Sequence, residues 1–314
     1  MRYKVFLAFL LAPLLCQGSI TFDFQYGTGA GYWTADRKSA LNSAANTLAS
    51  YLNVASPVTL TFAVTGHSTS GGSLASAGSG ISTSDGFNKT IVQDKVQTGF
   101  DQNGASADGV INWNFYYNWD TDDSIAAGYY DFKAVATHEL LHTFGFMSLI
   151  SSAGNNTQKY WSAFDDFVVD SGGNPVINDG TYVFNTAYNT NLTGGNGGLY
   201  FGGANAVAAF GGLVPLYTPA TWSGGSSVSH LDTTYFTGAN KKLMTHAVSS
   251  GPAIRTLSAI ELGILEDIGY SLAAASVPEP STWLMSLVAC GGIVITLARR
   301  RKTASGPTTD HQIR

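Results

Sequence analysis

The chain has 314 residues, of which 44% are hydrophobic and only 12% are charged, and its formal net charge at pH 7 is −5. This length allows one large domain or two small ones, and the acidic balance, without a basic stripe in the middle of the chain, argues against nucleic-acid binding. The 36 glycines, with many Ser, Thr and Asn residues, are typical of an extracellular domain rich in turns rather than of a cytosolic enzyme.

The N-terminus has the pattern of a secretory signal peptide, which we place at residues 1–19. Two basic residues precede an apolar run over residues 5–15, and small residues follow that run. Export signals share this order of segments. We expect cleavage after Gly18 or Ser19.

The exported chain is expected to begin with a strand, a helix and a second strand. Residues 20–26 and residues 58–66 alternate apolar and polar side chains, as half-buried strands do. Residues 37–53 carry apolar side chains at helical spacing, namely Ala40, Leu41, Ala44, Ala45, Leu48, Tyr51 and Leu52. This order of elements favours a twisted sheet with a helix packed on it.

Residues 68–86 are rich in Ser and Gly and predict a loop, and residues 109–119 predict a further strand. This strand has two possible positions. At an edge of the sheet it would pair with an extended peptide, and in the interior it would not; the sequence leaves both open. The acidic run at residues 120–123, with Asp120, Asp122 and Asp123, matches no full calcium-loop pattern, so that a solvated acidic turn is expected.

Residues 131–144 predict a helix that Gly145 ends, and this helix carries the pattern H-E-x-x-H. His138 and His142 are four residues apart, so they share one helix face with Cβ atoms about 5–6 Å apart. Both imidazoles can therefore bind one Zn²⁺. Glu139 projects roughly 100° round the helix from His138 and can reach a water molecule at the metal, as a general base must.

A catalytic zinc ion needs a third protein ligand, and the residues alone leave its identity open. The long form of the motif would place a histidine at position 148, but that residue is Ser148, a poor zinc ligand. The remaining candidates are His67, His230, His246, Glu261 and Asp165. Among them, His67 is expected to be a solvated loop residue and Glu261 a helix cap.

Residues 146–229 are rich in Gly, Asn and Tyr and predict loops with short strands. They include an expected hairpin over residues 164–177, with its turn at residues 171–174. A final helix is predicted over residues 255–272. It begins at a capping box formed by Ser258 and Glu261, and Gly269 ends it.

In residues 276–302, a Pro-Glu-Pro triplet at 278–280 precedes an apolar run at 283–298 and a basic cluster at 299–302. This order of segments resembles the PEP-CTERM sorting signal of Gram-negative bacteria. The run is short for a spanning helix, which needs about 17–25 residues, and its basic flank should stay in the cytoplasm with a short tail, residues 303–314. The resemblance implies an exosortase-type partner, a membrane contact before processing, and delivery to the cell envelope or extracellular matrix.

The only two cysteines, Cys16 and Cys290, lie within the two terminal segments. A lipid anchor on Cys16 is not expected, because the large Leu15 precedes it where lipoproteins have a small residue. The exported domain, residues 20–275, therefore has no disulfide, no thiol nucleophile and no cysteine-based metal site.

The motif and the segments after it resemble the leishmanolysin-like branch of the metzincin zinc peptidases. Residues 138–146, HELLHTFGF, are similar to the metzincin helix and its following turn, and a long insertion at 146–229 then precedes His230, Met244 and the last helix. The resemblance implies an α+β zincin fold with a twisted mixed sheet, two main helices and a loop and β insertion. It also implies that His230, rather than His246, is the third ligand, and that Met244 lies in a tight turn beneath the metal. The chain lacks the many disulfides of eukaryotic members.

Together these features predict a secreted zinc endopeptidase that acts on a protein or peptide. Zinc held by His138, His142 and His230 would acidify a bound water and polarise the scissile carbonyl, and Glu139 would move the water's proton to the leaving amine. The alternative is a non-enzymatic envelope or matrix protein with a structural zinc site, which a fourth ligand such as His246 would close. Glu139 favours the enzyme, because a structural site has no use for a base.

Overall fold

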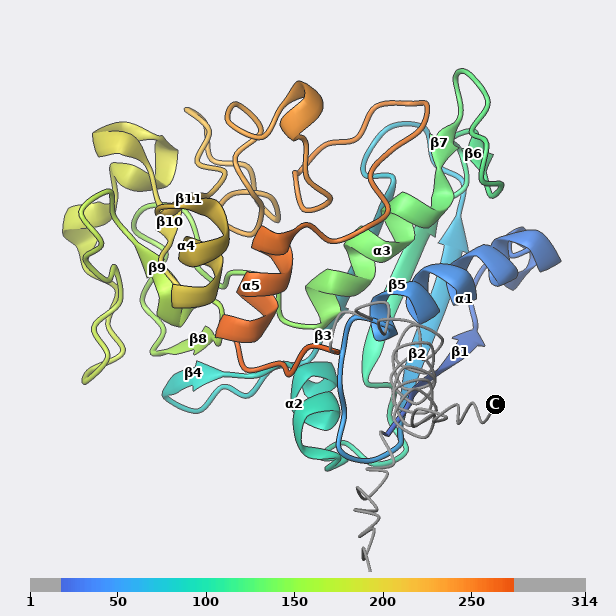
Figure 1. Cartoon of the computed structure of the whole chain (residues 1–314), viewed down its shortest axis with the longest axis horizontal. Coiled ribbons are helices and arrows are strands. Elements are labelled where there is room, and N and C mark those ends of the chain that lie inside the picture. The colour runs from blue at the N-terminus through green and yellow to red at the C-terminus, as the bar shows by residue number, and fades with distance from the viewer. Residues whose placement is uncertain (1–17, 274–314) are drawn as a thin grey trace, which may run out of the picture. The chain divides into compact units, whose positions relative to one another are not determined.

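The centre of the fold is a four-stranded sheet with the strand order β1-β2-β5-β3 (Figure 1). The structure is a computed structural model that describes residues 18–273. Strands β1 (Ile20–Tyr26), β2 (Val58–His67) and β5 (Gly109–Asn114) are parallel, while β3 (Ala75–Ser79) runs antiparallel to β5. The fold is therefore α+β with a mixed sheet, which confirms the coarse prediction.

Residues 109–119 do not provide an edge strand of this sheet, which was one of the two positions left open by the sequence. Strand β5 pairs with β2 on one side and β3 on the other, so it is an interior strand. The edge strand next to β5 is β3, which lies inside the segment 68–86 that was predicted to be a loop. Its sequence, ASAGS, consists of small side chains without apolar alternation, and it pairs through its backbone. The side-chain pattern therefore gives no sign of it.

Helices α1 (Ala35–Ala49) and α3 (Phe132–Thr143) lie side by side over the sheet (Figure 1). Helix α1 begins at Thr34, whose side chain accepts the backbone N–H of Arg37. Its buried face consists of the predicted small and branched residues Ala40, Leu41, Ala44, Ala45 and Leu48. This apolar stripe holds α1 against its neighbours.

Helix α3 is fixed at both ends. At its start, the Asp131 side chain caps the helix by accepting the N–H of Ala134 at 3.1 Å, and the ring of Phe132 stacks on Trp113 of β5 with centroids 4.1 Å apart. At its end, Gly145 has φ +94°, and a Cβ there would lie 2.5 Å from Gln93 Oε1. Only glycine meets both conditions, so the chain turns where the sequence predicts.

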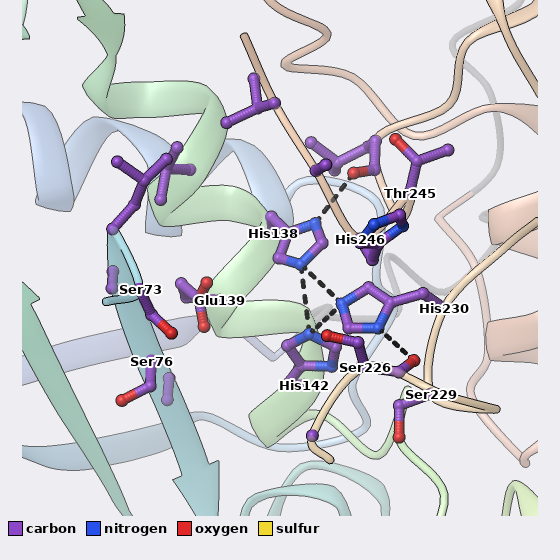
Figure 2. A pocket seen from close by; sticks show the side chains of 18 of the residues that line it. Ser73, Ser76, His138, Glu139, His142, Ser226, Ser229, His230, Thr245 and His246 are labelled. Carbon is purple, nitrogen blue, oxygen red and sulfur yellow. Dashed lines mark hydrogen bonds between the residues drawn. The ribbon is translucent and has the colours of Figure 1, made fainter. Parts of the chain in front are cut away.

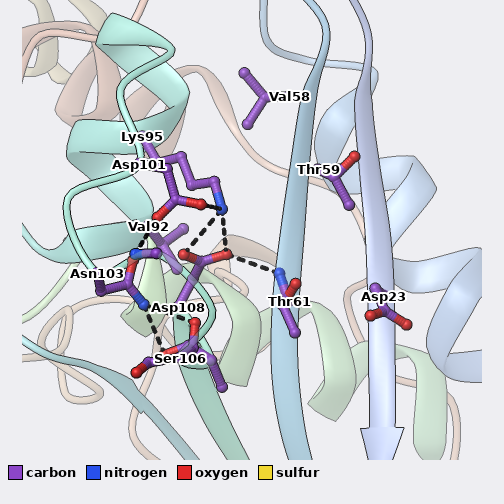
Figure 3. Close-up of polar contacts among 12 residues, drawn as sticks. Asp23, Val58, Thr59, Thr61, Val92, Lys95, Asp101, Asn103, Ser106 and Asp108 are labelled. Atoms are coloured by element: carbon purple, nitrogen blue, oxygen red, sulfur yellow. Dashed lines mark hydrogen bonds and ion pairs between the residues drawn. The ribbon is translucent and has the colours of Figure 1, made fainter.

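Helix α2 (Ile91–Thr98) was not predicted, because half of its buried side chains are polar: Val92, Gln93, Lys95 and Val96. A buried ion pair ties it to the sheet (Figure 3). The Lys95 ammonium lies 3.0 Å from Asp108 Oδ2 and 2.8 Å from Asp101 Oδ2. Asp108 Oδ2 also accepts the N–H of Thr61 in β2 at 2.8 Å. We call Lys95, Asp101 and Asp108 the Lys95 cluster.

The segment after α3 consists of short elements joined by turns and occupies the left and upper parts of Figure 1. Two small sheets hold β4 (Gly86–Asn88) against β8 (Tyr160–Ser162), and β9 (Val168–Val169), β10 (Tyr200–Phe201) and β11 (Val214–Pro215) together. The expected hairpin is present but short: Asp170 N–H donates to Asn174 O at 3.0 Å. Elsewhere, β6 (Trp119–Asp120) pairs with β7 (Tyr130–Asp131). Single 3-10 turns cover Ala30–Tyr32, Asp165–Phe167, Thr186–Tyr188, Asn191–Thr193, Gly195–Gly197 and Gly238–Asn240.

The last helix, α5 (Ala259–Asp267), begins at the predicted capping box of Ser258 and Glu261. Helix α4 (Ala204–Phe210), which was not predicted, packs closely against it. A Cβ at Gly263 of α5 would lie 2.7 Å from the backbone nitrogen of Ala206. Glycine therefore permits the close approach of these two helices.

The expected terminal signals fall mostly outside the described part of the chain. Residues 1–17 and 274–314 include most of the predicted signal peptide, the segment 276–302, the tail and both cysteines. Within residues 18–273, no helix is both long enough and apolar enough to cross a membrane.

Candidate metal centre

Three histidines from distant parts of the chain meet in one cavity (Figure 2). His138 and His142 lie one turn apart on α3, and His230 lies in the loop that follows β11. Their Nε2 atoms are separated by 3.1 Å (His138 to His230), 3.2 Å (His138 to His142) and 3.2 Å (His142 to His230). These three residues, the histidine cluster, lie close enough together to bind one metal ion.

The second nitrogen of each ring in the histidine cluster contacts a backbone carbonyl. For His138, His142 and His230 in turn, Nδ1 lies 2.9, 2.7 and 2.9 Å from the carbonyl oxygens of Leu243, Phe146 and Ser226. A carbonyl oxygen only accepts hydrogen bonds, so each Nδ1 carries the proton of its neutral ring and each Nε2 presents a lone pair. Lone pairs at 3.1–3.2 Å cannot hydrogen-bond to one another, and a cation between them would relieve their repulsion.

Burial keeps these rings neutral. It lowers the pKa of His138 to about 3, and the neighbouring His142 adds to this effect. Burial also lowers the pKa of His142, and it holds the pKa of His230 well below the ordinary value. No proton is therefore shared between the Nε2 atoms at neutral pH. Neutral imidazole is the form of histidine that binds metals.

Glu139 lies between the histidine cluster and strand β3 (Figure 2). The backbone N–H of Ala77 in β3 lies near enough to lower the pKa of this carboxyl group. Burial raises the pKa of Glu139 to about 7, and the Ala77 N–H partly opposes that rise. A carboxyl group with a pKa near neutrality can both accept and release a proton in a catalytic cycle.

Ser148 holds the site together rather than binding metal. Its hydroxyl donates to Asp165 Oδ1 at 2.5 Å, and its N–H donates to Ser229 Oγ at 3.1 Å. Ser229 directly precedes His230. Ser148 therefore ties the turn after α3 to the segment that returns, more than eighty positions later, with the third histidine.

Met244 is fully buried, and its backbone connects the histidine cluster to the last helix. Its carbonyl accepts the N–H of Leu231, next to His230, at 2.9 Å. Its own N–H donates to Glu261 Oε1 at 2.7 Å. The preceding residue, Leu243, provides the carbonyl that orients His138. The backbone around Met244 thus fixes histidines from both parts of the chain.

The carboxylates considered as third ligands are engaged elsewhere. Glu261 binds the Met244 N–H and caps α5 through Ser258, as a helix cap should. Asp165 accepts four hydrogen bonds, from the hydroxyls of Ser148 and Ser162 and from the backbone N–H groups of Leu149 and Ser162. Neither belongs to the group of close ligand atoms found within residues 18–273.

The other two histidines lie apart from the cluster. His67 is exposed at the end of β2. His246 lines the same cavity, but its ring centre is 6.5 Å from that of His230, and it stacks on Tyr217 instead. In the described part of the chain, the cluster of ligand atoms therefore has three members and no fourth histidine.

The acidic run after β5 makes contacts within the fold. Asp120 accepts the N–H groups of Asp122 and Ala126 at 3.0 and 2.9 Å. The exposed Asp123 carboxylate lies 2.7 Å from Lys133 Nζ and 2.8 Å from Arg255 Nη1. The carboxylates of Asp120 and Asp123 therefore both have partners within the protein.

A cavity of about 660 Å³ opens in front of the site, with walls from β3, α3 and the loops at residues 224–230 and 241–248. The site also depends on backbone groups. The carbonyls of Leu243, Phe146 and Ser226 orient the three histidine rings, and the Ala77 N–H lowers the pKa of Glu139. Sequence reasoning missed these groups, because a backbone group leaves no trace in residue identity.

No protein-family model and no curated protein matches the chain. What the site does must therefore be inferred from its own atoms.

Proposed function

We propose that this chain is a secreted zinc endopeptidase of the leishmanolysin-like metzincin type. The observation that carries the proposal is the convergence of three neutral Nε2 lone pairs beside the carboxyl group of Glu139. A metal site needs the lone pairs, and hydrolysis at that site needs the base. A structural site would need only the first.

The donor set fits zinc. Zinc binds imidazole nitrogen at about 2.0–2.1 Å, so a tetrahedral arrangement places the nitrogens about 3.3 Å apart. The Nε2 atoms lie 3.1–3.2 Å apart. Three neutral nitrogens are also the ligand set of known catalytic zinc sites, in which the fourth position stays open. The position of His246 outside the cluster of close ligand atoms supports an open site over a closed structural one.

The residues then divide the chemistry between them. Bound zinc supplies a Lewis acid that lowers the pKa of water and polarises a carbonyl group. Glu139 takes the proton of the attacking water and passes it to the nitrogen of the leaving amine. The Glu139 carboxylate lies at the side of the cavity next to β3, where the Ala77 N–H favours its charged form.

Strand β3 is the element best placed to bind an extended substrate. Among residues 18–273 it pairs with β5 along one edge only, and residues 74–79 line the cavity. A peptide that adds to a free strand edge is held by backbone hydrogen bonds whatever its side chains are. In the proposed enzyme, β3 therefore takes the role that residues 109–119 would have had at an edge.

The proposal includes export. The signal peptide at 1–19 would direct the chain out of the cytoplasm, and the segment at 276–302, by its resemblance to a PEP-CTERM signal, would deliver it to the envelope or extracellular matrix of a Gram-negative bacterium. The support for export comes from the sequence patterns of these two segments alone.

The substitution Glu139→Gln tests the mechanism. We expect the rate of casein cleavage to fall by about 10²–10⁴-fold, which is the usual contribution of a general base to the rate. The zinc content per chain should stay that of the wild type. Glu266→Gln, an exposed glutamate on α5, is the matched control and should cleave normally. Undiminished cleavage by Glu139→Gln would refute the assigned base.

A further inference from the structure

We propose that His246 is a second catalytic residue, which donates a hydrogen bond from Nε2 to the carbonyl oxygen of the scissile peptide bond as that oxygen gains negative charge. This inference rests on the proposed peptidase function. It gives a role to His246, which is neither a metal ligand nor the general base in that function.

The position of His246 in the cavity suits this role. Its ring lines the same cavity as Glu139, and the two side chains lie on opposite sides of the histidine cluster in Figure 2. Its ring centre is 6.5 Å from that of His230, which is too far to share a metal ion at bonding distance. A substrate carbonyl group bound between Glu139 and His246 would be attacked by water from the side of Glu139. Its oxygen would face His246.

Two contacts hold the His246 ring in place. It stacks on Tyr217, with ring centroids 3.8 Å apart and an interplanar angle of 16°. Its Nδ1 lies 3.4 Å from the hydroxyl oxygen of Thr233. When that hydroxyl donates to Nδ1, the proton of the neutral ring is on Nε2.

The ring therefore has a donor to offer. Burial lowers the pKa of His246, with Asp232 opposing the effect, so the ring is neutral at pH 7. Within residues 18–273, no protein hydrogen bond to its Nε2 is found; the contact with Thr233 uses Nδ1. A fixed donor costs little reorganisation when charge develops beside it, which is the basis of oxyanion stabilisation.

A purely structural role, in which His246 only packs on Tyr217, makes a different prediction. His246→Phe keeps an aromatic ring for the stack and removes the donor. If the donor matters, kcat falls by about 10²–10³-fold, as it does when one oxyanion donor is removed, while KM and zinc content stay near wild type. A phosphinic peptide, whose tetrahedral anionic phosphorus imitates the transition state, should lose affinity by a similar factor.

Thr233→Val gives a second measurement that leaves the histidine in place. Without the hydroxyl that orients the ring proton, we expect kcat to fall about 3- to 10-fold, the worth of one neutral hydrogen bond. Thr234→Val is the matched control, because this exposed neighbour bonds to Asp232 instead and should leave kcat unchanged.

The outcomes separate this inference from the proposed function. An active wild type together with an undiminished kcat in His246→Phe overturns the role of His246 alone, and so does loss of zinc from that variant, which would make His246 a ligand. A zinc-loaded wild type that cleaves neither casein nor model peptides overturns the peptidase and the role of His246 with it.

Discussion

The Lys95 cluster and the histidine cluster are both buried polar groups, but only in the Lys95 cluster do opposite charges of the protein itself face one another. The Lys95 ammonium lies within 3.0 Å of carboxylate oxygens of both Asp101 and Asp108. Burial alone would lower the pKa of Lys95, yet its bonds to the two carboxylates outweigh burial and raise it. In the histidine cluster, three lone pairs face one another, and the described part of the protein contributes no donor or positive charge to them.

This difference indicates which cluster serves the fold and which serves a ligand. A buried ion pair whose partners are all present is a structural tie, and it functions without anything from solution. A buried set of acceptors without a donor is unfavourable by itself, and becomes favourable when a cation binds. Substitutions at either cluster test this difference.

The largest expected effect on folding comes from the Lys95 cluster. Lys95→Met leaves the Asp108 carboxylate, whose side chain has 0% exposure, without its cation. The free energy of unfolding should fall by about 3–5 kcal/mol, as when one partner of a buried pair is removed. Urea unfolding measures this, and zinc content per folded chain should not change.

Lys133→Met is the control for this prediction, because its partner Asp123 is 88% exposed. An exposed ion pair contributes about 0–1 kcal/mol, so this variant should unfold almost like the wild type. Equal losses in the two variants would contradict the view that the Lys95 cluster is a structural tie set apart by its burial.

A second effect, which depends on pH, is expected from the histidine cluster when pH is lowered without metal. An unfolded histidine has a pKa of about 6.5, whereas burial lowers the pKa of His138 in the fold to about 3. Between these values the unfolded chain binds protons that the folded chain does not. Stability therefore falls as pH falls, by up to about 1.4 kcal/mol per pH unit for each such histidine.

This pH dependence is best measured as a difference between variants. Buried acids with a raised pKa, such as Glu139 and Asp165, act with the opposite sign, because the fold binds their protons first as pH falls. They are common to all variants and cancel. His230→Gln should reduce the slope between pH 6.5 and 5, while His67→Gln, an exposed histidine, should not. Equal slopes would mean that the buried histidines are not held neutral.

The sequence predicted best where local rules decide the structure. The bounds of β1 and the capped starts of α3 and α5 follow from alternation, from capping side chains and from helical spacing. Gly145 ends α3 as expected, because its φ of +94° disfavours other residues. Each of these features depends on residues within a few positions of one another.

Features that depend on distant partners were harder to predict. Strand β3 has no side-chain pattern, and helix α2 has Lys95 on its buried face, which is stable only because Asp108 lies opposite. Ser148 stands where the long form of the motif has a histidine, and its contacts with Asp165 and Ser229 require the fold to be known. The meeting of His230 with α3 was expected from the family resemblance alone, since spacing left several third ligands open.

The proposed function depends on whether the histidine cluster binds zinc through His230. Urea unfolding of the metal-free chain, with and without zinc at about 1,000 times its dissociation constant, should show a gain of about 4 kcal/mol in wild type and His67→Ala, with one zinc per chain by elemental analysis. His230→Ala, at the same zinc concentration, should lose most of that gain. A His230→Ala variant that keeps one zinc and the full gain, or a wild type that binds none, would contradict the account.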